Sequence, residues 1–196
     1  MCGRYASFRE AQDLADAFAL DEIAPDAAAL PPSWNLAPTD PVRIVVERAE
    51  KGAPADAAPR RALRLARWGL VPGWAKDPSV GARMINARVE SLAEKPSFRR
   101  ALAARRCLVP AEGYYEWTPA PAGSPPRTHK VAHWIHPEDG SVLAFAGLYE
   151  FWRDPSRPDD DPLRWLVSTT IVTDGAPPPG AVAALHERRP VVLAPE

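Results

Sequence analysis

The second residue of the chain is a cysteine, and this position gives it chemistry that an internal cysteine lacks. Aminopeptidases remove an initiator methionine when the next residue is small, so loss of Met1 would leave Cys2 with a free α-amine beside its thiol. The amine, with an ordinary pKa of roughly 8, is partly neutral near neutral pH and condenses with aldehydes. The thiol then adds to the imine and closes a five-membered thiazolidine. Taken by itself, Cys2 is more simply an accident of sequence.

Further chemically capable side chains stand in short blocks along the chain. The blocks are Met-Cys-Gly-Arg-Tyr (1–5), Arg-Trp-Gly-Leu-Val-Pro (67–72), Trp-Ala-Lys (74–76), Met-Ile-Asn-Ala-Arg-Val-Glu (84–90), Arg-Cys-Leu-Val-Pro (106–110), Gly-Tyr-Tyr-Glu-Trp (113–117) and Leu-His-Glu-Arg-Arg-Pro-Val-Val-Leu (185–193). In this order they resemble the signature blocks of the SRAP family, the SOS-response-associated peptidases. The resemblance runs from Cys2 to about Leu193, which is nearly the whole chain.

The resemblance implies a protein that shields abasic sites in single-stranded DNA through a thiazolidine crosslink. By motif position Cys2 would be the nucleophile, and Asn86, Glu116 and His186 would complete the catalytic site. A lyase activity and removal of its own Met1 are further expectations that come with the family.

Each of these roles also has a physical reason. An abasic sugar is mostly a closed hemiacetal, so a proton relay must open it, and Glu116 among aromatic residues is suited to act as general acid and base. A histidine side chain can take up or give a proton near neutral pH, so His186 would assist the same step. Asn86 would hydrogen-bond the Cys2 amine or a sugar hydroxyl without adding charge. The alternatives are an exposed strand carboxylate for Glu116, a structural histidine for His186 and an ordinary turn residue for Asn86.

DNA contacts are expected from arginine and tryptophan side chains. Guanidinium groups bind phosphate oxygens in a bidentate manner, and indole rings stack on bases. The candidates are Arg4, Arg88 and Arg188 for phosphates and Trp68, Trp74 and Trp117 for bases. Each arginine has a structural ion pair as its alternative, and most of the seven tryptophans are expected in the core. Cys107, next to Leu108 and Val109, is expected to be buried and inert.

Composition leaves a nucleic-acid partner open despite a net charge of −1. Residues 60–106 hold twelve Lys or Arg against Asp77, Glu90 and Glu94, a balance of +9, so the remainder carries −10. A polyanion responds to the local field, although a solvated basic face explains the same asymmetry. Two cysteines make no disulfide framework, and no ligand spacing suggests zinc, so no metal or cofactor is expected.

The chain has no apolar run long enough to span a membrane and no secretion signal. We therefore expect a cytoplasmic monomer that associates with the nucleoid when bound to DNA.

The elements that must position these residues can be read from the hydrophobic pattern. Ser7 and Glu10 form a capping-box pattern, and apolar residues at helical spacing then predict a first helix of about three turns. A second helix is expected from Ser97, as N-cap, to Arg105. Strands are predicted at residues 43–46, 63–68, 107–109, 114–117, 131–135, 142–148 and 165–172, with loops at 25–38, 51–59, 119–126, 154–162 and 174–180.

Many short strands with few helices and no βαβ alternation predict an α+β fold with a largely antiparallel sheet or barrel-like core and a few flanking helices. Residues 1–196 are expected to form one SRAP-like domain. Two features depart from the family pattern. Arg189 stands where the family usually has Met, and would either contact phosphate or face solvent. The sequence also stops at Glu196, where relatives continue, so it is either a shortened chain or a naturally short one.

Two other function classes compete with the crosslinker. The opening Met-Cys-Gly also resembles class II glutamine amidotransferases, in which the terminal amine activates its own thiol, so a peptidase or amidohydrolase is the first alternative. The second is a plain single-strand-binding module in which Cys2 is incidental. The three hypotheses predict different results. A crosslinker forms a stable adduct with an aldehyde, an amidohydrolase turns over amides, and a plain binding module keeps its activity in Cys2→Ala.

Overall fold

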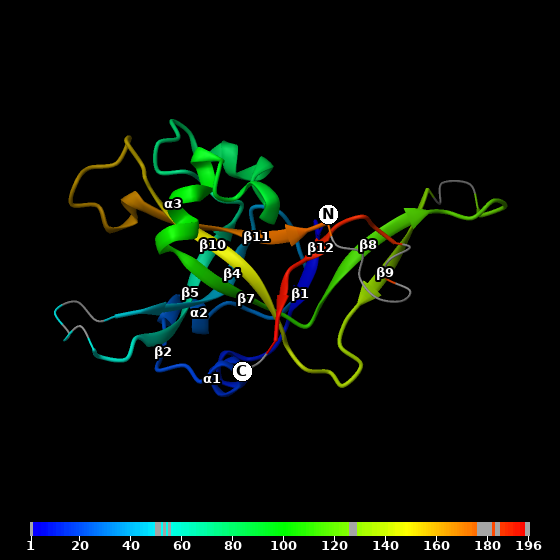
Figure 1. Ribbon diagram of the computed structural model, residues 1–196, viewed down its shortest axis with the longest axis horizontal. Helices are drawn as coiled ribbons and strands as arrows, with labels where there is room; N and C mark the ends of the chain where they lie inside the picture. Colours follow the sequence, from blue (N-terminus) through cyan, green and yellow to red (C-terminus); the bar gives the residue numbers. More distant parts are fainter. Residues whose placement is uncertain are drawn as a thin grey trace.

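The computed structural model describes residues 2–49, 52, 54, 56–125, 129–175, 182 and 185–194. Its strands form a larger and a smaller sheet, with helices packed outside, which confirms the predicted α+β class (Figure 1). Parts of the expected loops at 51–59, 119–126 and 174–180 lie outside the described residues.

Five strands of the larger sheet close into a barrel: β4 (Pro41–Arg48), β5 (Arg60–Trp68), β7 (Arg106–Ala111), β10 (Leu143–Arg153) and β11 (Trp165–Asp174). The same sheet also contains the short strands β2 (Glu22–Ile23) beside β5, β6 (Asn86–Arg88) and β12 (Arg189–Pro190) beside β11, and β13 (Val192–Leu193) beside β10. Neighbours pair antiparallel along the order β11-β10-β7-β4-β5. The ring closes because β11 also pairs in parallel with β5, Ser168 opposite Arg67.

The smaller sheet carries the N-terminal segment. It has the order β3-β1-β8-β9, with β1 (Tyr5–Ser7), β3 (Ser33–Leu36), β8 (Gly113–Pro119) and β9 (Lys130–Ile135). Tyr5 pairs with Leu36 on one side and with Tyr114 on the other, so β1 is fixed from both edges. The β8–β9 hairpin projects from the barrel to the right in Figure 1.

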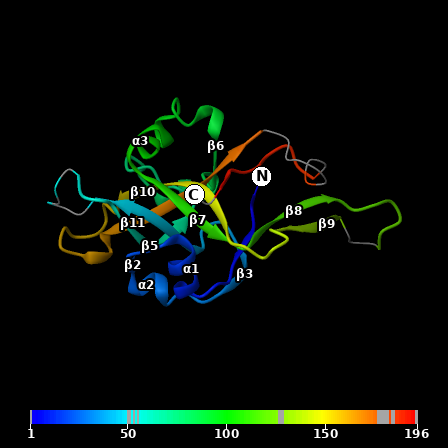
Figure 2. The same cartoon turned by 60° about the horizontal axis from the view of Figure 1, so that its bottom comes forward.

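The helices cover two opposite sides of the barrel. The α-helices are α1 (Ala11–Phe18), α2 (Pro25–Ala28) and α3 (Pro96–Ala104), and the 3-10 helices are η1 (Pro78–Arg83), η2 (Val89–Ser91) and η3 (Pro162–Arg164). Helices α1 and α2 lie on one side and α3 on the other in both views (Figures 1 and 2). Leu14 of α1 packs with Val45 and Leu63, whereas Phe98 of α3 packs with Leu148 and Val172. The barrel interior between them holds a third core cluster around Tyr5, Trp68 and Phe145.

All seven predicted strands are confirmed, most of them longer by one to five residues at an end. The helix starts were less accurate. Ser7 lies within β1 instead of capping α1, and α1 follows Glu10 without a side-chain cap and ends at Phe18. Helix α3 begins at Pro96 after Lys95, so Ser97 is inside it. The expected loop at 25–38 contains α2 and β3. No helix of the described chain is long and apolar enough to cross a membrane.

Candidate active site

Cys2 lies at the start of the chain, immediately before β1, and is fully buried. Its side chain belongs to the barrel core cluster, and its Sγ lies 3.7 Å from the Arg4 carbonyl oxygen. The Cys2 carbonyl accepts a hydrogen bond from Asn86 Nδ2 at 2.8 Å. These contacts hold the N-terminal segment against β6.

The strand β6 positions Asn86 because it pairs in parallel with β11, Asn86 opposite Ile171. The Nδ2 of the Asn86 amide donates its hydrogen bond to the Cys2 carbonyl. Its Oδ1 is buried, and within the described residues it has no hydrogen-bond partner. A buried amide oxygen without a partner is costly unless a donor fills the position, so this atom is available to a ligand or a terminal amine.

Glu116 is placed by the alternation of β8. Tyr114 and Glu116 occupy the buried face of the strand, whereas Tyr115 and Trp117 occupy a half-buried face. Burial raises the pKa of the Cys2 thiol to about 12, and the negative charge of Glu116 adds to the rise. Glu116 is itself only 4% exposed. A neutral thiol and a buried carboxylate within electrostatic range are the parts of a proton-transfer pair.

Tyr114 joins this group, although no role was predicted for it. Burial raises the pKa of its phenol to about 12, with further rises from Cys2 and Glu116. The positive charge of Arg189 acts on Tyr114 in the opposite direction, so Arg189 is within electrostatic range of the site. The i, i+2 spacing of Tyr114 and Glu116 in a predicted strand was the signal that would have placed both on one face.

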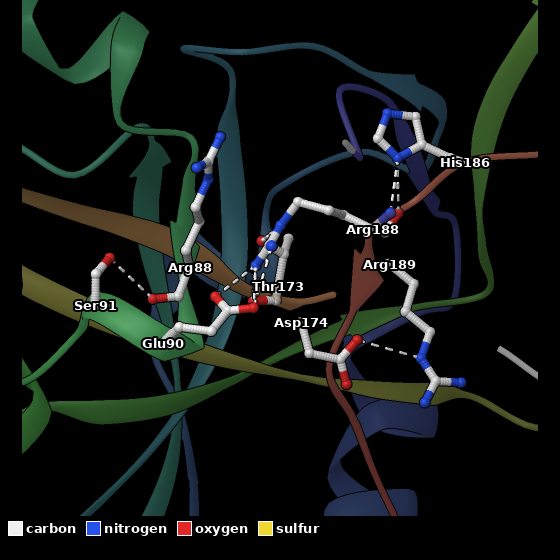
Figure 3. A network of polar contacts seen from close by, with 8 residues as sticks. All are labelled: Arg88, Glu90, Ser91, Thr173, Asp174, His186, Arg188 and Arg189. Atoms are coloured by element: carbon white, nitrogen blue, oxygen red, sulfur yellow. Dashed lines mark hydrogen bonds and ion pairs between the residues drawn. The ribbon is translucent and has the colours of Figure 1, made fainter. Parts of the chain in front are cut away.

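Arg189 was predicted either to contact phosphate or to face solvent, and in the structure it pairs with an aspartate. It is half-buried, and its Nε lies 3.4 Å from Asp174 Oδ1, across the β11–β12 pairing (Figure 3).

His186 stands on the segment that precedes β12. The Arg188 backbone N–H donates to His186 Nδ1 at 2.9 Å, and the Arg188 carbonyl lies 3.1 Å from the same nitrogen. Arg188 itself donates to both oxygens of Glu90, with Nη2 to Oε2 at 2.8 Å, and to the Thr173 carbonyl at 3.0 Å (Figure 3). His186 is therefore tied to the Asn-Ala-Arg-Val-Glu block through Arg188 and Glu90.

The three predicted phosphate ligands differ in their surroundings. Arg88 is exposed, and its guanidinium extends away from Glu90 in Figure 3. Arg4 is half-buried and donates to Asn35 Oδ1 at 3.0 Å. Arg188 is committed to Glu90, with 16% of its side chain exposed, so the structural alternative describes its present contacts.

The three predicted stacking residues also separate by exposure. Trp74 is 65% exposed and Trp117 is half-buried. Trp68 is fully buried in the barrel, where its Nε1 donates to the Ile85 carbonyl at 3.0 Å, so no base can reach its face. Cys107, which was predicted to be buried, is buried, and its Sγ lies 3.5 Å from Thr169 Oγ1.

The cations of the basic segment at 60–106 fall into two groups, those in ion pairs and those that are exposed. Arg61, Arg64 and Arg105 form ion pairs with glutamates. The exposed cations around η1, η2 and α3 are Lys76, Arg83, Arg88, Lys95, Arg99 and Arg100. Among the described residues, no three His, Cys, Asp or Glu side chains gather as metal ligands would.

Comparison with known proteins decides the family. The model of the SOS response associated peptidase (SRAP) family matches residues 1–196. The chain belongs to the SRAP family. Relatives in this family include the abasic site processing protein YoqW of Bacillus subtilis, 38% identical over 196 residues that cover 100% of this chain and 77% of the relative. Chicken HMCES, also named an abasic site processing protein, is 30% identical over 178 residues that cover 83% of this chain and 51% of the relative.

Solved structures share this fold. A phage-related protein from Bordetella bronchiseptica superimposes with a TM-score of 0.62 at 30% identity, over 98% of this chain and 77% of that chain. A protein from Bacteroides thetaiotaomicron has the same fold, with a TM-score of 0.73 at 20% identity, over 98% of this chain and 77% of that chain.

Proposed function

We propose that this SRAP protein processes abasic sites by forming a covalent crosslink between Cys2 and single-stranded DNA. The observation that carries the proposal is the convergence of Cys2, Asn86 and Glu116 from three distant parts of the chain. The names of the relatives YoqW and HMCES support the substrate class.

In the proposed reaction Glu116, assisted by His186, moves the proton that opens the sugar hemiacetal to its aldehyde. The α-amine of Cys2, free after loss of Met1, adds to the aldehyde carbon, and one water leaves as the imine forms. The Cys2 thiol then adds across the C=N bond: sulfur bonds to carbon and the thiol proton passes to nitrogen. One water is lost overall, and the product is a thiazolidine.

The environment of Cys2 fits the second addition. The thiol, with a pKa raised to about 12, is protonated at neutral pH, so it does not react as a free thiolate. The buried Glu116 would accept that proton as the carbon–sulfur bond forms. The Asn86 amide would orient the amine, since its Oδ1 is a buried acceptor. Burial thus favours intramolecular ring closure over reaction with other electrophiles.

The exposed cations near α3, with Arg4 and Arg88, would hold the phosphates. Because such contacts release counterions, binding should weaken steeply as salt rises. Trp74 and Trp117 remain as candidates for stacking on bases.

The test is intact-mass spectrometry after incubation with a single-stranded oligonucleotide that carries one abasic site. The mass of the unreacted protein reports whether Met1 is gone. We expect protein plus DNA minus one water, absent with Cys2→Ala and with undamaged DNA. If fully processed protein forms no adduct, the crosslink is wrong, and amide substrates of an N-terminal cysteine hydrolase become the next assay.

A second variant separates chemistry from binding. Glu116→Gln is expected to slow crosslinking by about 10²- to 10⁴-fold, the usual contribution of a general acid–base group, while DNA affinity changes little. An unchanged rate would remove Glu116 from proton transfer.

A further inference from the structure

An open groove of about 790 Å³ lies away from the Cys2 site, and none of its lining residues belongs to that site. Trp74 and Trp165 line it with 65% and 52% of their surfaces exposed, and Phe151 of β10 lines it as well. Arg100 from α3 reaches the same groove. Exposed indoles together with guanidinium groups are the side chains that bind single strands without sequence preference.

The backbone segments that carry Trp74 and Trp165 are both anchored to the barrel. Trp152 Nε1 donates to the Ala75 carbonyl at 2.7 Å, which anchors the loop that carries Trp74 to β10. Trp165 pairs with Arg153 at the end of the β10–β11 hairpin, and the Arg164 guanidinium lies 5.7 Å from its ring centre. Preorganised aromatic surfaces lose little conformational freedom on binding.

The charge of the groove suits an anion. Among the described residues that line it, Glu150 is the one carboxylate, and it is buried and paired with Arg105 at 2.7 Å. Arg153 pairs with Asp159 on the neighbouring loop. Among the described residues, Arg100 has no ion-pair partner and is exposed, as are Arg99 of α3 and Lys95 immediately before it. The groove therefore presents a net positive charge beside aromatic faces.

The groove lies at a fixed distance from the candidate active site. Ile171, which pairs with Asn86, and Trp165 are six residues apart on the same strand β11. At the usual rise of a strand this separation is roughly 20 Å. A stacked nucleic-acid strand advances about 3.4 Å per nucleotide, so about six nucleotides, or fewer when stretched, span it.

We propose that this groove is a second binding site for single-stranded DNA, which holds the nucleotides several positions to one side of the abasic site. The proposal rests on the crosslinking function argued above, because that function places the strand at Cys2. The groove lies at one end of the barrel, so nucleotides added on one side of the lesion reach it and those added on the other side do not.

The test compares three abasic oligonucleotides: one with about two flanking nucleotides on each side, one extended by about ten on the 5′ side, and one extended by about ten on the 3′ side. One extension is expected to raise affinity by about tenfold, the effect of one stacked base, and the other to change it little. Trp165→Ala and Arg100→Gln are expected to abolish that gain. Leu163→Ala is the matched control, since Leu163 is 71% exposed near Trp165 without lining the groove.

The groove assignment is overturned if neither extension helps, or if the gain survives both variants while thermal unfolding shows them folded. It is also overturned if peptides quench the tryptophan fluorescence of the groove and DNA does not compete with them. Undamaged oligonucleotides separate the two proposals: length-dependent quenching lost in Trp165→Ala supports the groove even when Cys2 forms no adduct. An adduct without length dependence supports the crosslink alone.

Discussion

At the scale of single residues, Arg188 links the segment that carries His186 to Glu90 and β11. Its side chain binds both oxygens of Glu90 and the Thr173 carbonyl, while its backbone N–H donates to His186 Nδ1. Hydrogen bonding to Arg188 lowers the pKa of Glu90 to about 2, so the pair stays ionised at every physiological pH. Arg188 is therefore a positioning residue for His186 in its present contacts.

We expect Glu90→Gln to reduce the crosslinking rate a few-fold, because it removes the charge that holds Arg188 and loosens the segment that carries His186. Glu90→Asp keeps the charge and should restore part of the rate. Glu94→Gln is the matched control, an exposed glutamate in the same segment. Rates from gel-resolved adducts, with the pH titration of the His186 ring by NMR, check this. A normal rate and an unchanged titration in Glu90→Gln would show that Thr173 alone positions Arg188.

At the scale of elements, the turn after β5 depends on a close approach of two backbones. Gly69 has φ +124°, and a Cβ built on it would lie 2.5 Å from the Gly81 carbonyl oxygen. Its N–H donates to the Thr169 carbonyl at 2.8 Å, next to the β5–β11 pairing that closes the barrel. The Gly in the Trp-Gly-Leu block is thus required by geometry.

Gly69→Ala is expected to lower the free energy of unfolding by about 1–3 kcal/mol from backbone strain, and by more where η1 cannot move away. Gly73→Ala is the control, because its Cβ would make only an ordinary 3.4 Å contact with the Phe151 carbonyl and should change stability by less than about 0.5 kcal/mol. Urea unfolding of both variants measures the difference. Equal stabilities would mean that η1 shifts at little cost.

Elements were predictable where a local pattern decided them. Residues 107–117 and 131–148 alternate or cluster apolar side chains, so β7 to β10 could be placed from sequence. Ser7 was misassigned because its pairing partner Ser33 in β3 lies far away in the chain, and that pairing overrode a local cap. The parallel closure of β11 on β5 has no local signal. For the site, the order of the sequence blocks indicated Cys2, Asn86 and Glu116. The burial of Trp68 and the pairing of Arg188 with Glu90 depend on tertiary packing and could not be predicted.

At the scale of the whole molecule, several neutral acids are enclosed in one barrel. Burial raises the pKa values of the Cys2 and Cys107 thiols to about 12, and burial also raises the pKa of Tyr5. In the unfolded chain a thiol titrates near 9.0. Between these values the unfolded state loses protons that the folded state keeps, so stability falls as pH rises.

We therefore expect the free energy of unfolding to be steady below about pH 9 and to fall above it, by up to about 1.4 kcal/mol per pH unit for each buried thiol. Urea titrations from neutral to alkaline pH measure the slope. Cys107→Ala should make the slope shallower whatever it does to stability at neutral pH. Equal slopes for the two proteins would show that Cys107 ionises without unfolding.

The closure of the barrel also fixes an order of events during synthesis. The enclosed Cys2 is bound by Asn86 on β6, and β6 is held by β11, which pairs at Ile171. Contacts so far apart in sequence form late in folding. At a translation rate of about 5–20 residues per second, Ile171 is made roughly 10–30 s after Cys2. A methionine aminopeptidase acting on the nascent chain therefore has this interval in which the terminus is not yet enclosed.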